Sequence, residues 1–160
     1  MGTSHSPIHS NISLSTNSSS GTGGRFRVHA HTHNAPLDLT FSTTPPDSRL
    51  VLDASTKNAP AHVALHPPAF FEGGFVLQTT QFQPTLYVTP GVKDPSGRGR
   101  ERKVRTHAVL GGRALIGNVS WVPPGGDVQT VDDDDGGGGS GGGADWASVI
   151  TRNAPVTLVL

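Results

Sequence analysis

The stretch Thr32-His33-Asn34-Ala35-Pro36 recurs as Thr56-Lys57-Asn58-Ala59-Pro60 and as Thr151-Arg152-Asn153-Ala154-Pro155. Asn tolerates the left-handed backbone that tight turns need, and a residue before Pro is pushed towards extended geometry. Asn-Ala-Pro therefore predicts a turn followed by a strand. Repetition of one such phrase is typical of repeated β units, and it bears on architecture more than on chemistry.

Apolar residues alternate with polar ones on both sides of each copy. After the first copy they stand at Leu37, Leu39 and Phe41, and the same alternation precedes it over residues 26–32. A period of two gives a strand one buried and one exposed face. Each Asn-Ala-Pro is therefore expected to join two half-buried strands.

The first two copies start at positions 32 and 56. A further step of the same length reaches Thr80, after which Pro84 stands where the earlier copies have Pro36 and Pro60. We interpret this segment as a degenerate third copy. The spacing predicts a chain built from repeats of about 24 residues.

The chain is predicted to be all-β, and two architectures fit such a repeat. In a β-solenoid-like stack each repeat is one coil, and equivalent turns lie over one another, which favours identical turns. In a two-layer β-sandwich each repeat is an antiparallel hairpin, and nothing requires the turns to be alike. The near identity of the copies favours the stack, and the sandwich stays open.

Length and composition fit one modest domain. The 160 residues are 33% hydrophobic and include 21 Gly and 13 Pro, so the chain is poor in core residues and rich in turns. We expect a single all-β repeat domain over 25–160 after a disordered Ser/Thr/Asn/Gly-rich tail over 1–24. Flexible loops are expected at 90–103 and at 132–143, where an acidic run precedes a glycine tract. Between them, a hairpin is expected around Gly111-Gly112.

Charge and cysteine content exclude several classes of function. The formal net charge is zero, so no global field attracts nucleic acid or anionic membrane. The absence of cysteine excludes disulfides, thiolate metal sites and cysteine nucleophiles. The N-terminal residues do not form a secretory signal, and no run approaches the roughly 18 apolar residues of a membrane span. We expect a cytoplasmic or otherwise intracellular protein with no membrane partner, and nucleic acid is a disfavoured partner.

Three histidines at a spacing of two, His29, His31 and His33, precede and enter the first turn. Alternate residues of a strand lie about 6 to 7 Å apart on one face, and imidazole is a common zinc ligand. These residues are the candidate metal site, and zinc is the candidate cofactor. A solvated polar face without a ligand is the alternative, because outward polar residues are what alternation alone predicts.

A basic segment is the second candidate site, and it consists of Arg98, Arg100, Arg102, Lys103 and Arg105. Arginines separated by glycines suit contact with an anion or a nucleic-acid backbone. Aromatic residues that could stack on bases are scarce in this segment. A solvated loop is the alternative, since charge runs usually mark exposed segments.

The repeated Thr-x-Asn-Ala-Pro phrase, the loop Asp94-Pro95-Ser96-Gly97-Arg98-Gly99-Arg100 and the glycine-containing strand pair that ends in Trp121 together carry a resemblance. By these features the chain resembles an uncharacterised fungal family of domains of unknown function. Its strand repeats are similar in style to bacterial putative-adhesin domains that form β-solenoid-like stacks. The resemblance covers the 25–160 region and implies a fold, and it carries no catalytic residues.

Enzymatic arrangements are hard to assemble from this sequence. No Gly-x-Ser-x-Gly elbow or Walker loop is present, and Glu72 and Glu101 are the only glutamates. We therefore expect a non-enzymatic structural or protein-interaction β-repeat module without a cofactor. A His-rich metal-binding module is the alternative. A hydrolase acting on a polymer is a weaker one, because it needs clustered acids.

Overall fold

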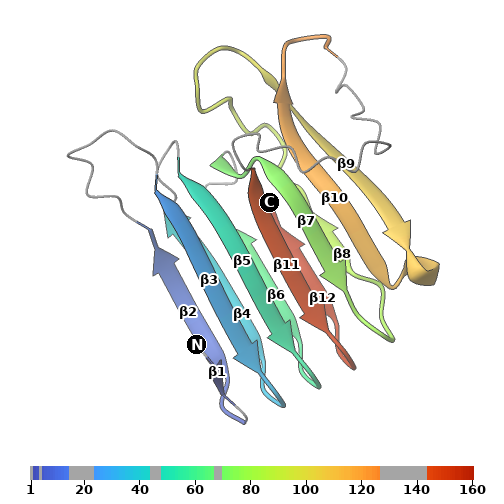
Figure 1. Ribbon diagram of the computed structural model, residues 1–160. Coiled ribbons are helices and arrows are strands. Elements are labelled where there is room, and N and C mark those ends of the chain that lie inside the picture. The colour runs from blue at the N-terminus through green and yellow to red at the C-terminus, as the bar shows by residue number, and fades with distance from the viewer. Residues whose placement is uncertain (1, 4, 15–23, 44–47, 67–69, 127–143) are drawn as a thin grey trace, which may run out of the picture.

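The structure is a computed structural model that describes residues 2–3, 5–14, 24–43, 48–66, 70–126 and 144–160. Their strands form two sheets (Figure 1). Sheet A contains, in spatial order, β1 (Gly2–Thr3), β3 (Arg25–Thr32), β5 (Arg49–Thr56), β11 (Asp145–Thr151), β7 (Gly73–Gln78), β10 (Ala114–Val122) and β9 (Glu101–Val109). Sheet B contains β2 (Ile8–Ser13), β4 (Leu37–Thr43), β6 (Ala61–Leu65), β12 (Val156–Val159) and β8 (Thr85–Tyr87). The all-β prediction is confirmed. Among the described residues, none belongs to a helix with the length and apolarity that a membrane crossing needs.

Each Asn-Ala-Pro turn leads from a strand of sheet A into a strand of sheet B. The segments β1–β2, β3–β4, β5–β6, β11–β12 and β7–β8 are termed units here. Neighbouring units pair in parallel in both sheets. The turns therefore do not make the antiparallel hairpins considered for a sandwich. The expected hairpin is β9–β10, which extends sheet A beyond β7 with Leu110–Gly112 at its turn.

The inward faces of the two sheets share one hydrophobic core. Its members come from both sheets and include side chains that are completely buried, such as Leu39 and Phe41 of β4, Leu52 of β5 and Val149 of β11. Inward and outward residues alternate along these strands, as the period-two pattern predicts. Burial of these faces against one another is the main apolar stabilisation of the fold.

A buried threonine closes each Asn-Ala-Pro turn from within. Its hydroxyl donates a hydrogen bond to the carbonyl of the alanine three residues later, and the pairs are Thr32 with Ala35, Thr56 with Ala59 and Thr151 with Ala154. These threonines and alanines are all buried. The phrase therefore combines a small residue that fits beneath the turn with a hydroxyl that satisfies a buried carbonyl.

The register between units corrects one detail of the predicted repeat. β3 and β5 pair with the expected offset, from Arg25 beside Arg49 onwards. In the degenerate copy, Ile150 pairs with Gln78, so the position next to Thr151 belongs to Thr79 rather than Thr80. Thr79 is 1% exposed, like the other turn threonines, whereas Thr80 is exposed. The prediction of Thr80 is wrong by one residue, because this turn has one more residue before its proline.

The prediction of a disordered tail over 1–24 is wrong for the part that the structure describes. β2 pairs with β4 in parallel, and β1 pairs with the end of β3. Ile8 is buried, and Ile12 and Leu14 pack against the core. These three apolar residues connect the β1–β2 unit to the hydrophobic core. Residues 15–23 lie outside the described residues, as does the loop expected at 132–143. The loop expected at 90–103 ends earlier, because β9 begins at Glu101.

The spatial order of the units differs from their order in the chain. β11–β12 lies between β5–β6 and β7–β8, although it follows both in sequence (Figure 1). At its start, Asp145 accepts hydrogen bonds from the backbone N–H of Leu50 (2.7 Å) and of Glu72 (2.9 Å) through its two carboxylate oxygens. Burial raises the pKa of Asp145, and these two N–H groups partly oppose that rise. The carboxylate thus joins the units on both sides of the inserted one.

Substitution of two adjacent glycines in β7, Gly73 and Gly74, tests how closely the backbone of β11 approaches β7. A Cβ on Gly73 would overlap the backbone carbonyl of Asp145, whereas a Cβ on Gly74 would lie 2.6 Å from an atom of the Trp146 ring, which can rotate away. We expect Gly73→Ala to lower the free energy of unfolding by about 3 kcal/mol or more and Gly74→Ala to cost less. Urea denaturation measures both. Equal losses would contradict the close approach of β11 at Gly73.

Candidate functional site

The outward face of sheet A carries rows of side chains that cross from strand to strand, because directly paired residues share a face. One row runs across six strands and consists of Arg27, Val51, Trp146, Gly74, Asn118 and Arg105. The next row consists of His29, Asp53, Ser148, Val76, Ile116 and His107. In both rows apolar residues lie between the two outer positions, Val51 and Trp146 in the first row and Val76 and Ile116 in the second, and the polar residues Asp53, Ser148 and Asn118 lie among them.

The apolar residues at the centre are termed the apolar stripe, which comprises Val51, Trp146, Val76, Ile116 and Ile150. Trp146 and Ile116 are 44% and 43% exposed, and the other three are half-buried. The Trp146 ring lies over Gly74 of the neighbouring strand, which has no side chain to displace it. This stripe was not predicted from the sequence, in which its only signal is the outward phase of Trp146 and Ile150 in the alternating pattern.

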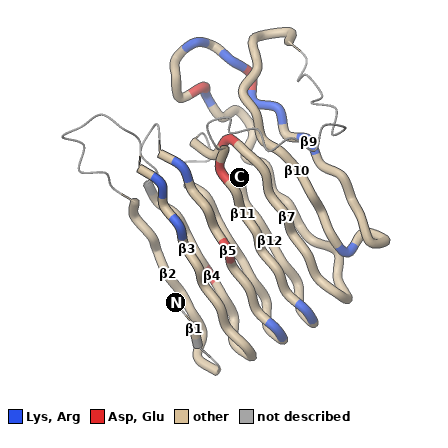
Figure 2. Tube along the Cα trace, in the orientation of Figure 1, with Lys and Arg blue, Asp and Glu red and all other residues tan. Residues whose placement is uncertain are grey.

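Basic residues flank the apolar stripe on two sides of the sheet. Arg25, Arg27 and Arg49 lie on β3 and β5, and Arg105 lies on β9, where Figure 2 shows blue segments. Five strand spacings separate Arg27 from Arg105, or about 24 Å. A partner that covers the stripe would therefore meet positive charge at both sides.

The structure does not gather the three predicted metal ligands around one point. Each lies beside its equivalent in the β5–β6 unit: His29 Nδ1 is 3.6 Å from an Asp53 carboxylate oxygen, His31 Nδ1 is 2.8 Å from Ser55 Oγ and His33 Nε2 is 3.4 Å from Lys57 Nζ. Within the described ranges, no group of three or more His, Asp or Glu side chains is arranged to hold a metal ion. Zinc binding by this triplet stays a prediction.

Sheet B presents a row that was not singled out from the sequence. Asp38 of β4 lies between His9 of β2, at 3.7 Å, and His62 of β6, at 3.1 Å. The signal for it was the repeat spacing, which separates positions 38 and 62 by one step. All three side chains are about half-exposed, so solvent screens these pairs and each contributes about 0 to 1 kcal/mol to stability.

The five residues of the predicted basic site differ in their contacts and in their exposure. Arg100 pairs with Asp94 at 3.2 Å and Lys103 with Glu101 at 3.5 Å. Arg98 and Arg105 are exposed, whereas the nitrogen atoms of Arg102 are buried. The structure therefore does not present these five residues as one cationic surface.

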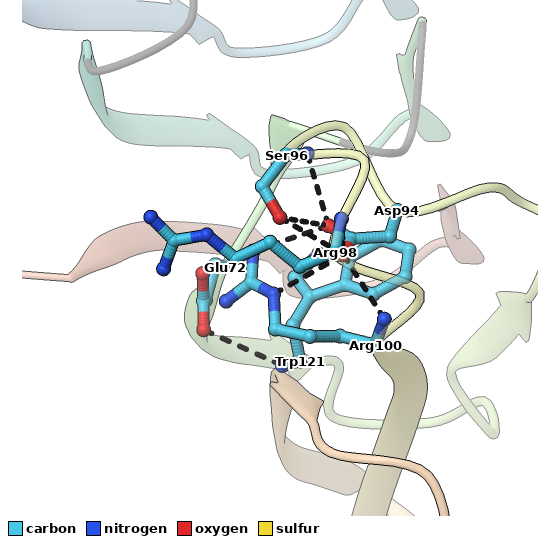
Figure 3. Close-up of polar contacts among 6 residues, drawn as sticks. All are labelled: Glu72, Asp94, Ser96, Arg98, Arg100 and Trp121. Carbon is cyan, nitrogen blue, oxygen red and sulfur yellow. Dashed lines mark hydrogen bonds and ion pairs between the residues drawn. The ribbon is translucent and has the colours of Figure 1, made fainter.

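Asp94 organises the loop over residues 94–100 (Figure 3). Its carboxylate accepts hydrogen bonds from the backbone N–H groups of Ser96 (3.0 Å), Arg98 (3.1 Å) and Arg100 (3.0 Å). Desolvation alone would raise the pKa of Asp94, but these donors, with the side chains of Arg100 and Ser96, lower it far below its ordinary value. The predicted loop has a defined conformation at this point.

The loop brings Arg100 against Trp121, on the inner face of the β9–β10 hairpin. The Arg100 guanidinium lies 5.9 Å from the centre of the Trp121 ring, and the backbone N–H of Trp121 donates to Glu72 at 3.4 Å (Figure 3). Arg102 is paired with Trp121 across the hairpin. Its three guanidinium nitrogens are buried without a hydrogen-bond partner among the described residues, and burial lowers its pKa.

Comparison with known proteins adds no family assignment: no family model, no curated protein and no solved structure matches the chain. The resemblance to a fungal domain family stays a prediction.

Replacing Arg102 tests whether its guanidinium has a partner. We expect Arg102→Met to raise the free energy of unfolding by about 1 to 3 kcal/mol, because it removes a buried charge without hydrogen bonds and keeps the apolar stem. Arg98→Met, at an exposed position, is the control and should stay within about 0.5 kcal/mol of the original protein. Urea denaturation in phosphate-free buffer measures both. Destabilisation by Arg102→Met would show that the guanidinium is paired.

Asp94→Asn tests the loop through its dependence on pH. The folded pKa of Asp94 lies below its ordinary value of 3.8, so the stability that the carboxylate contributes is complete above that value and is lost as the pH falls further. We expect a lower thermal midpoint for the variant at pH 7, and a difference that narrows below about pH 4. Glu101→Gln, which alters an exposed ion pair, is the control. A difference that is constant down to pH 2 would contradict this account.

Proposed function

We propose that the chain is a β-solenoid-like repeat module with a structural and protein-interaction role and no catalytic one. The parallel pairing of its units supports the repeat. β3 with β5 and β4 with β6 keep one and the same offset, which sets Arg25 beside Arg49 and Leu37 beside Ala61. β11 also pairs in parallel with both of its neighbours, which sets Trp146 beside Val51 of β5 and Asp145 beside Gly73 of β7. Stacking of equivalent positions is the arrangement expected of solenoid repeats.

Contacts between successive turns also support a stack. Asn58 Nδ2 donates to Asn34 Oδ1 at 2.6 Å, and Asn153 Nδ2 donates to Asn58 Oδ1 at 2.8 Å. The backbone follows the same order, with Asn58 N–H donating to the carbonyl of His33 and Asn153 N–H to that of Lys57. Equivalent residues thus bond to one another from unit to unit.

The apolar stripe is the single observation that carries the interaction role. Two large side chains, Trp146 and Ile116, remain exposed on one sheet face beside three further apolar residues. Contiguous exposed apolar surface marks interaction sites, and tryptophan is enriched among the residues that dominate binding energy. The basic residues at both sides favour an acidic partner. We infer that the stripe binds an acidic protein segment that carries apolar side chains.

Other roles have weaker support. The carboxylates on the strands of sheet A, Asp53, Glu101 and Asp145, belong to different rows, so a polymer hydrolase lacks the paired acids it needs there. Nucleic acid is disfavoured because Arg100 and Lys103 are already paired with carboxylates. An intracellular location, which the absence of cysteine allows, belongs to the same proposal.

A random peptide library, selected on the purified protein, tests the stripe. The double variant Trp146→Lys/Ile116→Lys changes the stripe, and Thr40→Lys/Thr157→Lys places the same charges on the outward face of sheet B as a control. We expect selected peptides to combine Asp or Glu with apolar residues. Their affinity should fall about 30-fold or more for the stripe variant, as for loss of a binding hot spot, and should be retained by the control. Peptides that bind all three proteins equally would refute the proposal.

A further inference from the structure

The inserted unit β11–β12 takes its place through contacts with units that precede it by many residues. β11 pairs with β5 over Trp146–Thr151 and with β7 over Asp145–Ile150. β12 pairs with β6 and with β8. The edges of β5–β6 and β7–β8 that receive this unit are termed the slot. The slot and the inserted unit are complementary along both sheets.

The inserted unit contributes a large share of the core. Ala147, Val149, Val156, Leu158 and Leu160 are all 0% exposed. A slot without this unit would expose the apolar side chains that it covers and two pairs of strand edges. Unpaired parallel edges beside an apolar surface readily accept another strand.

Specific contacts make the slot selective for this segment of the chain. Asp145 bonds to Leu50 and Glu72, one on each side of the slot. At the other end of β11, the carbonyl of Arg152 accepts the N–H of Thr80 at 2.9 Å, and Asn153 bonds to Asn58. An occupant therefore needs an acid at its start and an Asn-Ala-Pro turn at the right distance.

The connection to the inserted unit is much longer than its path requires. Val119 of β10 and Asp145 of β11 both pair with Gly73, from opposite sides, so they lie about 10 Å apart. Val122 lies about 10 Å further along β10. The segment between Val122 and Asp145, roughly 22 residues, can reach about 75 Å when extended. This length is sufficient for β11–β12 to reach the slot of a neighbouring molecule.

We propose that β11–β12 is an exchangeable unit, so that the slot of one copy accepts β11–β12 of a second copy and the two chains complete one another. Every contact within the slot is the same whether the unit comes from its own chain or from another. The swapped form therefore differs mainly in the entropy of association and in the path of the connection, and high protein concentration favours it.

Engineered cysteines test this exchange without background, because the chain has no cysteine of its own. Asp53 and Ser148 are directly paired and outward-facing, and paired strands lie about 4.8 Å apart, which is within the range of a disulfide. One full-length protein carries Asp53→Cys and another carries Ser148→Cys. The two are mixed in urea under reducing conditions, refolded together at high concentration and then oxidised.

A third protein with both substitutions in one chain is refolded at low concentration and should form the bond within the chain, which shows that β11 occupies the slot. A mixture of His29→Cys and Asp53→Cys proteins is the matched control, because these positions are also directly paired but belong to units consecutive in sequence. We expect a covalent dimer joining positions 53 and 148 at a level several-fold above the control mixture. Dimer at or below the control level, with the bond forming within the doubly substituted chain, would overturn the exchange.

Discussion

Parallel, in-register pairing between units is the constraint on which the rest of the structure depends. It places each residue beside its equivalent in the next unit, so a residue at a turn position must be compatible with copies of itself. Asparagine satisfies this requirement because its amide both donates and accepts, as the contacts of Asn58 with Asn34 and Asn153 show. The second position of the phrase is freer. His33, Lys57 and Arg152 occupy it, and their side chains can extend into solvent.

The strands and their turns could be predicted from local sequence, because period-two burial and Asn-Ala-Pro geometry are local properties. The order of the units could not. The three copies indicate which residues are equivalent, but equivalence does not say which unit lies next to which, and β11–β12 takes a place between earlier ones. The extra residue in the turn after Thr79 shifted the degenerate copy by one position. The N-terminal unit was hidden because three apolar residues, Ile8, Ile12 and Leu14, lie in an otherwise polar stretch.

For the candidate sites, too, the sequence indicates which residue types are present but not which residues they contact. Histidines and arginines could be found from the sequence, but each has its contacts in another unit or loop, as with His29 and Asp53 or Arg100 and Asp94. The apolar stripe depends on the insertion, which brings Trp146 beside Val51 on one side and over Gly74 on the other. Arg102 was expected at the surface, and its burial follows from its pairing with Trp121 on the inner face of the hairpin.

The position of β11–β12 between earlier units also determines when the fold can be completed during synthesis. β11 pairs with β5 and β7, which are both made long before it, so these strands lack their neighbour until residues 145–159 have been made. At about 5 to 20 residues per second, a ribosome needs about 4 to 17 s to proceed from Gly73 to Val159. Pairings at such separation close slowly even in a complete chain. For this interval the nascent chain contains β5 and β7 without the strand that pairs with both of them in the completed fold.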